Sequence, residues 1–431
     1  MMTSVKTWNA GELDPKVSEG DTVSRYGNRF LWTSNHMTGR QMLPMTMEAD
    51  PLADEAIALL KGRGVQAILD SIDSEKCPPQ IKRLHEQITN VPEWVDMDQI
   101  LRGQEFYWET FHDNGRVLMN HSLISDFAVS SIVRVLTCTG NLANPKSAYR
   151  RGAETAYMVS SAMERGQLSP GGRGWTSVVG VRLMHAQARI HATRISQRTN
   201  KSLLGVAINQ QDLMFTLLLF SVTVILGYEK LGVKFTTQQR DDYMATFRYV
   251  GYLLGIQDPN NIMASFDTAL AMKQSLDVYL IQPNKESAHM TKVVLKSFEK
   301  NPPFFLSFRH HVQTARLLMG DALANELQLP HANTGLDLSL KLTMYRQNKM
   351  LDLMLRVNRQ WGLSFLERKV LEAYRILLKG DAKFQFSEYS ESQDYSVNAG
   401  PQKINPYCTL LISIPVLATL CWTHLGVVLA L

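Results

Sequence analysis

The sequence predicts an all-α protein, a single large helical domain with a hydrophobic helix near the C-terminus. Apolar residues recur at three- and four-residue spacing along most of the 431 residues, which is typical of helices with one buried face. Strand patterns of period two are scarce, and no internal repeat is visible. The chain is 45% hydrophobic and 20% charged, an ordinary globular composition that excludes disordered, collagen-like and disulfide-scaffold classes.

The predicted helices follow one another almost without interruption. Their ranges are 52–63, 97–108, 124–136, 146–165, 177–198, 212–228, 237–254, 261–279, 286–298, 308–327, 338–348, 351–361 and 365–378. A Pro-Gly-Gly-Arg-Gly stretch at 170–174 separates two of them and predicts a helix-to-helix turn. The apolar run at 213–228 would be only about 24 Å long as a helix, so we expect a core helix rather than a membrane span.

Four segments are expected along the chain: an N-terminal extension (1–24), the helical domain (25–385), a polar linker (386–405) and a transmembrane tail (406–431). The tail contains no Lys, Arg, Asp or Glu, and as a helix it would measure roughly 39 Å, more than the hydrocarbon core of a bilayer. The alternative is a buried C-terminal helix. The first residues lack the apolar core of a signal peptide. We therefore expect a single-pass protein of the endoplasmic reticulum with its helical domain in the cytosol.

Charge and cysteine patterns limit the classes of partner. Residues 146–201 contain ten Lys or Arg against two acids, a net charge of +8, whereas the whole chain carries +5. Such a stretch predicts a local anionic partner. No zinc-finger, RNP or helix-turn-helix signature accompanies it, so nucleic acid is not expected. Cysteines stand at positions 77, 138, 408 and 421, and none forms a CxxC pair.

Two neighbouring helices carry the strongest candidate site. Arg182, His185 and Arg189 share one face of the helix at 177–198, and Arg151 and Thr155 share a face of the helix at 146–165. A histidine with an arginine one turn away on each side suits haem, because imidazole ligates iron while guanidinium groups pair with the propionates. The alternative is a core histidine with satisfied hydrogen bonds and arginines in surface ion pairs.

Two Glu-x-x-His patterns permit a different metal site. Glu109 precedes His112, and Glu286 precedes His289, by three residues, as in di-iron carboxylate bundles. Such a site needs two further acids, for which Glu105, Glu154 and Glu164 are available. However, Glu286 follows Pro-Asn-Lys and has the position of a solvent-facing acid in a first helical turn.

The stretch from Ala148 to Arg189 resembles the catalytic core of the MpaB / rubber oxygenase (latex-clearing protein) family. The matching features are Arg-x-x-x-Thr at 151–155, Pro-Gly-Gly-x-Gly-Trp at 170–175 and Val-Arg-Leu-Met-His-Ala-x-x-Arg at 181–189. The likeness extends less specifically over about residues 100–330. It implies an all-α oxygenase that uses haem b, with His185 as the proximal iron ligand and with Arg151 and Thr155 shaping the pocket. It also implies cleavage or oxygenation of a C=C bond with O2 in a small lipophilic, isoprenoid-bearing substrate.

Two departures from the family pattern argue against rubber as the substrate. Glu154 stands where rubber oxygenases have a lysine next to the threonine, and the sequence has a hydrophobic tail in place of an export leader. No counterpart of the family's proposed glutamate base is evident. Two other interpretations remain open: a non-haem di-iron oxygenase, and a non-enzymatic membrane-anchored module whose basic segment binds acidic lipid headgroups.

Overall fold

The described part of the chain is residues 5–378, apart from residues 61–63, 73, 75, 140–143, 200–204, 302–305 and 332–333, in a computed structural model. Both the linker at 386–405 and the tail at 406–431 lie outside these described residues.

A small three-stranded sheet begins in the segment expected to be an extension (1–24) and continues into the segment assigned to the helical domain. Strands β1 (Val5–Thr7) and β2 (Thr22–Arg25) are parallel, and β3 (Asn28–Leu31) pairs antiparallel with β2. Trp8 between them is fully buried, with its ring 5.4 Å from that of Trp32. Residues 5–24 are therefore packed onto the helical body.

Helices form the rest of the fold, and the all-α prediction is confirmed. The N-terminal helices are α1 (Gly39–Met42), η1 (Leu43–Met47), α2 (Pro51–Leu60), α3 (Val65–Ile72) and α4 (Pro79–Thr89). The body contains α5 (Met97–Glu109), α6 (Phe111–Val117), the π-helix η2 (Leu118–Ser122), α7 (Leu123–Phe127), α8 (Ser130–Thr139), α9 (Pro145–Ala162), α10 (Arg173–Thr199), α11 (Gln210–Phe220), α12 (Val222–Leu231), α13 (Thr237–Leu253), η3 (Pro259–Ala264), α14 (Phe266–Leu280), α15 (Lys285–Ser297), α16 (Phe308–Met319) and α17 (Asp321–Glu326). Last come α18 (Thr334–Val357) and α19 (Arg359–Leu378).

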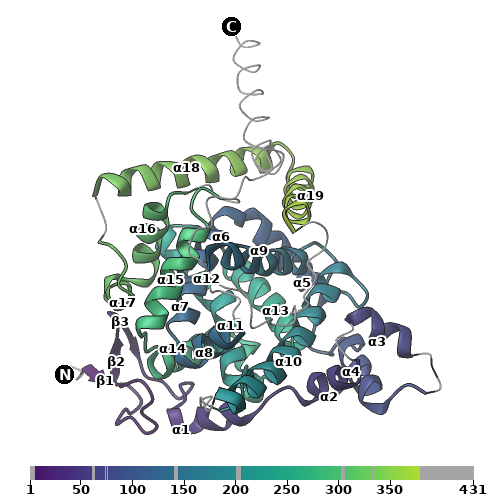
Figure 1. Ribbon diagram of the computed structural model, residues 1–431. Helices are drawn as coiled ribbons and strands as arrows, with labels where there is room; N and C mark the ends of the chain where they lie inside the picture. The colour runs from purple at the N-terminus through teal and green to yellow at the C-terminus, as the bar shows by residue number, and fades with distance from the viewer. Residues whose placement is uncertain are drawn as a thin grey trace.

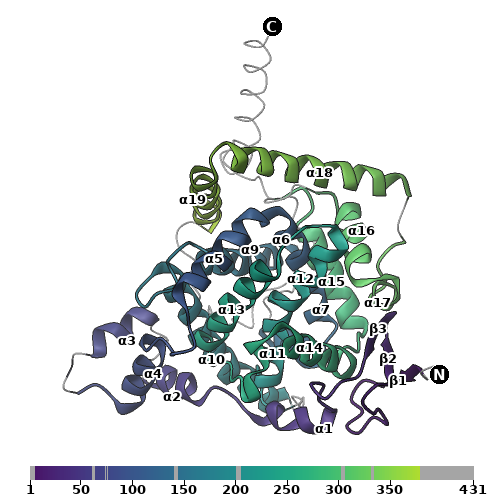
Figure 2. The same ribbon diagram turned by 180° about the vertical axis from the view of Figure 1, so that it is seen from behind.

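Helix α9 lies near the centre of the molecule and packs against α10, α15 and α19 (Figure 1). The sheet and the α3–α4 pair occupy opposite lower corners, and α18 crosses the top, as Figure 2 shows from behind. Helices α5 and α13 approach closely at Gly103, where a Cβ atom would lie 2.2 Å from the Thr246 hydroxyl. The elements around α9 and α10 therefore enclose the core that positions the site.

The turn between α9 and α10 depends on glycine. Gly171 has φ +83°, a conformation that other residues rarely adopt. A Cβ atom on Gly174 would lie 2.4 Å from the Ser161 carbonyl oxygen. This stretch thus folds as the predicted turn and brings the start of α10 against the end of α9.

Several helix predictions need revision. The helix expected at 308–327 divides at Gly320 into α16 and α17, and the one expected at 261–279 divides into η3 and α14. The apolar run at 212–228 divides into α11 and α12 at Ser221. By length and composition, residues Gln210–Leu231 are the one described helical run able to cross a membrane, but 83% of its 18-residue window is buried, as expected of a core helix. The three helices expected over 338–378 are two, because α18 continues through Lys349 and because Gly362 lies inside α19.

Candidate active site

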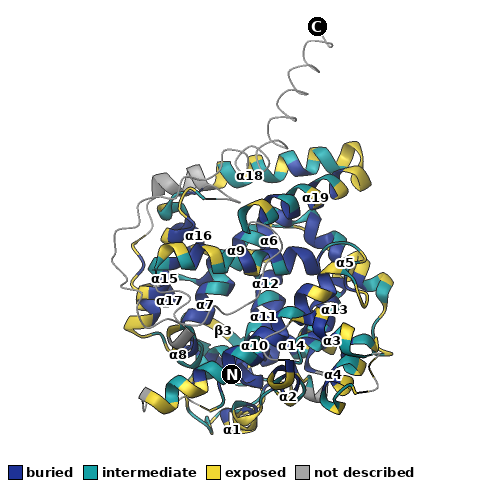
Figure 3. Cartoon of the chain, turned by 45° about the vertical axis from the view of Figure 1, so that its right-hand side comes forward, coloured by how far each residue is buried: buried dark blue, intermediate teal, exposed yellow. Residues whose placement is uncertain are grey.

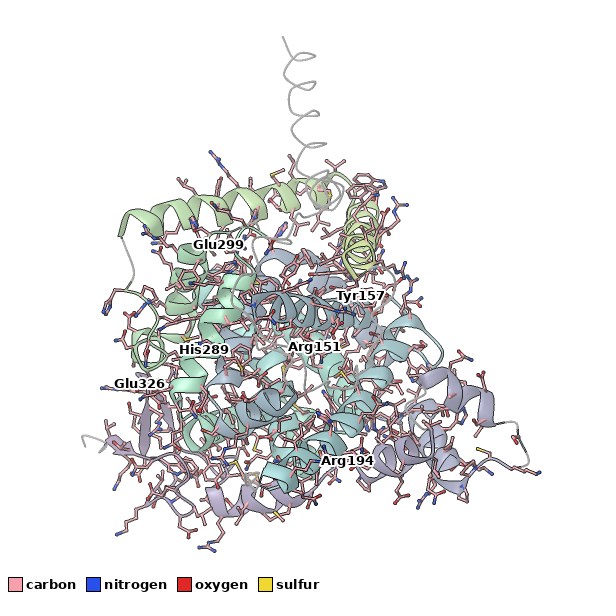
Figure 4. The ribbon with its side chains drawn as sticks, in the orientation of Figure 1. Arg151, Tyr157, Arg194, His289, Glu299 and Glu326 are labelled. Carbon is pink, nitrogen blue, oxygen red and sulfur yellow. The ribbon has the colours of Figure 1, made fainter. Side chains whose placement is uncertain are left out.

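A cavity of about 370 Å³ lies between α9 and α10, within the size range of small-molecule sites. Its walls come from α5 to α11, α13, α15 and α19 and are mostly apolar. Figure 4 places Arg151, one of its lining residues, in the middle of the molecule. Such a cavity favours a lipophilic ligand.

His185 is the histidine that lines this cavity among the described residues. Its Nδ1 atom is buried and has no hydrogen-bond partner. Burial and, to a smaller extent, the charges of Arg189 and Arg151 lower the pKa of His185 to about 4, against an opposing effect of Asp50. The ring is therefore neutral at pH 7, the form that binds a metal.

Arg151 and Thr155 line the cavity from α9, opposite His185 on α10. The Thr155 hydroxyl donates to the Arg151 carbonyl oxygen at 3.1 Å. The Arg151 guanidinium donates to Glu154 at 2.7 Å and reaches the Met184 sulfur at 3.3 Å. The structure thus brings three of the five predicted site residues to one cavity.

Glu154 gives this cavity an acidic group where the family pattern has a lysine. Its carboxylate lines the cavity, is buried and accepts hydrogen bonds from both Arg150 and Arg151. The Glu154 carboxylate therefore has two cationic partners, and its hydrogen bond to Arg151 fixes the position of that guanidinium group.

Arg182 and Arg189 do not line this cavity. Arg182 Nε donates to Asp50 Oδ2 at 2.6 Å, its Nη2 donates to Asp50 Oδ1 at 2.9 Å, and its Nη1 donates to Gln87. Arg182 borders a separate cavity of about 360 Å³. The expectation that this arginine pairs with a haem propionate therefore disagrees with its position.

Arg189 is likewise held away from the cavity. Its Nε donates to Asp54 at 2.9 Å, and its Nη1 donates to the Ile208 carbonyl oxygen at 2.5 Å. On α10, Val181, Met184 and Ala188 face the cavity, and the two arginines lie on the side that packs against α2. Hence His185 sits at the boundary of these two sides.

Part of the basic stretch at 146–201 is paired within the chain. Among its described residues, six form the following ion pairs: Arg150 and Arg151 with Glu154, Arg165 with Glu367, Arg173 with Glu164, Arg182 with Asp50 and Arg189 with Asp54. Three of these carboxylates, Asp50, Asp54 and Glu367, come from outside the stretch, so they lower its excess of +8 to +5, and an external anionic partner stays a prediction.

The geometry gives the di-iron alternative no support either. In the part of the chain that the structure describes, no group of three or more His, Cys, Asp and Glu side chains could hold a metal ion. Glu109 pairs with Arg359, while His289 is exposed on α15, at the side of the molecule in Figure 4.

Two buried acids in the cavity wall escaped the sequence analysis, Asp126 of α7 and Asp212 of α11. Burial and, to a smaller extent, the charge of Asp212 raise the pKa of Asp126 to about 7, while the Thr216 hydroxyl that donates to it at 3.0 Å opposes the rise. Burial also raises the pKa of Asp212 to about 6, against a hydrogen bond from Ser131. Either carboxyl can hold a proton near neutral pH. The feature of the sequence that could have identified them is that each is an acidic residue within an otherwise apolar run.

Comparisons with known proteins agree with this architecture. A solved structure titled "Structure of Latex Clearing Protein LCP in the closed state" matches with a TM-score of 0.57 and 20% sequence identity, over 76% of this chain and 91% of that chain. None of the curated proteins matches this chain. The family model described as "ER-bound oxygenase mpaB/B'/Rubber oxygenase, catalytic domain" matches residues 117–346, which include the walls contributed by α9 and α10. The chain therefore belongs to the mpaB/rubber oxygenase catalytic-domain family.

Proposed function

We propose that the protein is a haem b-dependent oxygenase in which His185 holds the iron. The observation that carries the proposal is the neutral imidazole of His185, with an unpartnered Nδ1, on the wall of a large apolar cavity. When bound, haem supplies an iron that activates O2 for attack on an apolar carbon–carbon double bond. Membership of an oxygenase family supports the same chemistry.

The residues of the cavity have distinct roles in this proposal. The apolar walls bind an isoprenoid chain and exclude water. Arg151 is a cationic side chain in the wall; Glu154 holds its Nη1, and its Nη2, at the Met184 sulfur, is the group that would pair with a propionate, in the role first assigned to Arg182 and Arg189. Thr155 limits the space beside it. Asp126 holds or accepts a proton at its carboxyl group.

The substrate class follows from the same walls. A small lipophilic compound with an isoprenoid chain suits a cavity with mostly apolar walls. The name of the matching family includes both an ER-bound oxygenase and a rubber oxygenase. We propose the former as the closer parallel, with the uncharged run at 406–431 as a membrane anchor that keeps the domain on the cytosolic side of the endoplasmic reticulum.

The ligand assignment is tested by comparing His185→Ala with His311→Ala. His311 is a histidine that is 1% exposed, pairs through Nδ1 with Asn120 at 2.8 Å and does not line the cavity. We expect His185→Ala to lose the Soret band of the purified protein and His311→Ala to keep it, with circular dichroism confirming that both variants are folded. A full Soret band in folded His185→Ala would contradict the assignment.

A further inference from the structure

Helix α18 presents an apolar face that nothing in the described chain covers. Leu342, Tyr345, Leu353 and Val357 are 51%, 65%, 43% and 63% exposed. Their spacing places them on one side of the helix, because the residues three, eleven and fifteen positions after Leu342 each lie within about 60° of it, so that the four span an arc of about 120°. We call these four residues the α18 outer face. Figure 3 shows the exposed residues of α18 along the top of the molecule.

The opposite side of α18 is fixed to the body. Leu351 is buried. Asn348 donates to Asp113 at 2.7 Å, and Gln347 accepts from Arg116. Since these buried contacts determine how the helix is rotated, the outer face stays in solvent while the helix remains packed.

Basic residues surround the α18 outer face. Arg346, Lys349 and Arg356 are exposed on the same side of the helix. Lys349 and Arg356 share one partner, Asp352, at 3.5 and 2.9 Å, so these three cations face one acid. Residues 341–378 contain eight Lys or Arg and three acids, a net charge of +5. Apolar side chains among cationic ones are typical of helices that lie in the interface of an anionic bilayer.

The corner between α18 and α19 has a residue suited to the same environment. Trp361 is 55% exposed and stacks on Phe365, with the ring centroids 5.2 Å apart. Tryptophan is enriched where a protein meets the headgroup region, since its ring is apolar and its N–H is polar.

The position of this surface in the chain favours lipid over a second protein. Helix α19 packs against α18, and the sequence that follows Leu378 contains the uncharged run at 406–431. Helix α19 also contributes Tyr374 and Leu377 to the wall of the main cavity. A bilayer in contact with the outer sides of α18 and α19 would therefore lie next to α19, which borders the cavity.

We propose that the α18 outer face, with Trp361, docks on the surface of a bilayer that contains anionic lipid. The apolar side chains enter the interface and the basic side chains contact lipid phosphate and carboxylate groups. Docking does not depend on haem or on catalysis, so its failure would leave the proposed oxygenase function untouched.

The test uses the full-length chain with Cys77, Cys138, Cys408 and Cys421 changed to Ser. An environment-sensitive NBD fluorophore is attached at Leu353→Cys, or at Arg194→Cys as the matched control. Arg194 is exposed and lies at the end of the molecule away from α18 (Figure 4). Each protein is added to phosphatidylcholine vesicles with and without phosphatidylserine, and quenching by brominated phosphatidylcholine is measured.

We expect quenching of the probe at position 353 in vesicles with phosphatidylserine, and none at position 194. Arg346→Gln and Lys349→Gln should each lower the ratio of docked to undocked α18 about fivefold. Changing Leu342 and Val357 to Ser should also lower quenching at 353, which controls for the probe's own affinity for lipid. The probe reports its own depth, so the result is independent of whether residues 406–431 insert.

Three results would overturn the proposal. The first is an unquenched probe at 353 on protein that floats with the vesicles. The second is equal quenching at 353 and 194, which indicates adsorption without orientation. The third is energy transfer between labelled copies in the absence of lipid, which assigns the face to self-association.

Discussion

Replacing Asp50 by Ala should destabilise the protein strongly, because it leaves the Arg182 guanidinium buried without its counter-charge. The two side chains are 5% and 2% exposed and are joined by hydrogen bonds of 2.6 and 2.9 Å. Removing one partner of such a pair costs about 3–5 kcal/mol, since the remaining charge is desolvated and unpaired. Asp50 also accepts from the Ala53 N–H at the start of α2, at 3.3 Å, a helix-capping contact worth about 1 kcal/mol.

The free energy of unfolding, from urea denaturation followed by circular dichroism, should therefore fall by about 4–6 kcal/mol in Asp50→Ala. Gln87 still accepts one hydrogen bond from Arg182, so the lower end of the range is expected. The double variant Asp50→Ala with Arg182→Met should regain most of the loss, because no buried charge remains.

The matched control is the exposed pair Arg83–Glu55, whose side chains are 56% and 46% exposed. Glu55→Ala should change the free energy of unfolding by less than about 1 kcal/mol, because solvent screens the pair. If Asp50→Ala proved as mild as Glu55→Ala, or if the double variant proved less stable than Asp50→Ala, the account of this buried pair would be wrong.

Three further predictions concern the cavity and the tail. Arg151→Ala and Thr155→Ala should retain more haem than His185→Ala does, yet turn substrate over more slowly than the wild type, because both residues shape the cavity. Visible spectra and turnover rates measure the two effects, and normal rates in both variants would contradict the prediction. The pKa of Asp126 is raised from 3.8 to about 7, so its contribution to stability is complete below pH 4 and is lost as the pH rises through 7. Thermal melts should thus show a steeper fall in stability over pH 4–7 in the wild type than in Asp126→Asn, and parallel curves would count against a protonated Asp126. A chain that stops at Lys403 should be soluble, folded and haem-loaded if residues 406–431 are an anchor, whereas aggregation or loss of haem would indicate a packed helix.

Local patterns predicted the helical class, because helical spacing and the glycine-rich turn are encoded within a few residues. Spacing also placed Arg182, His185 and Arg189 near one another on α10. Sequence spacing could not identify the partners of the two arginines, because Asp50 and Asp54 are more than a hundred residues away in the chain. The hydrogen bonds to these acids hold Arg182 and Arg189 outside the cavity.

The two buried acids of the cavity wall also could not be identified from local sequence. Asp126 and Asp212 lie in apolar stretches, where a single acid gives no indication that it faces a cavity. Only the packing of α7 against α11 brings them to one wall and raises their pKa values.

The ion pairs of the basic stretch at 146–201 have a consequence for where the folding unit ends. The family match covers residues 117–346, yet Arg182 and Arg189 find their carboxylates at Asp50 and Asp54, and Arg165 finds its own at Glu367. All three carboxylates lie outside the matched segment. A polypeptide cut to residues 117–346 would lose these counter-ions together with α2, α5 and α19, which pack against α10, α13 and α9, so the region defined by homology is smaller than the unit that folds.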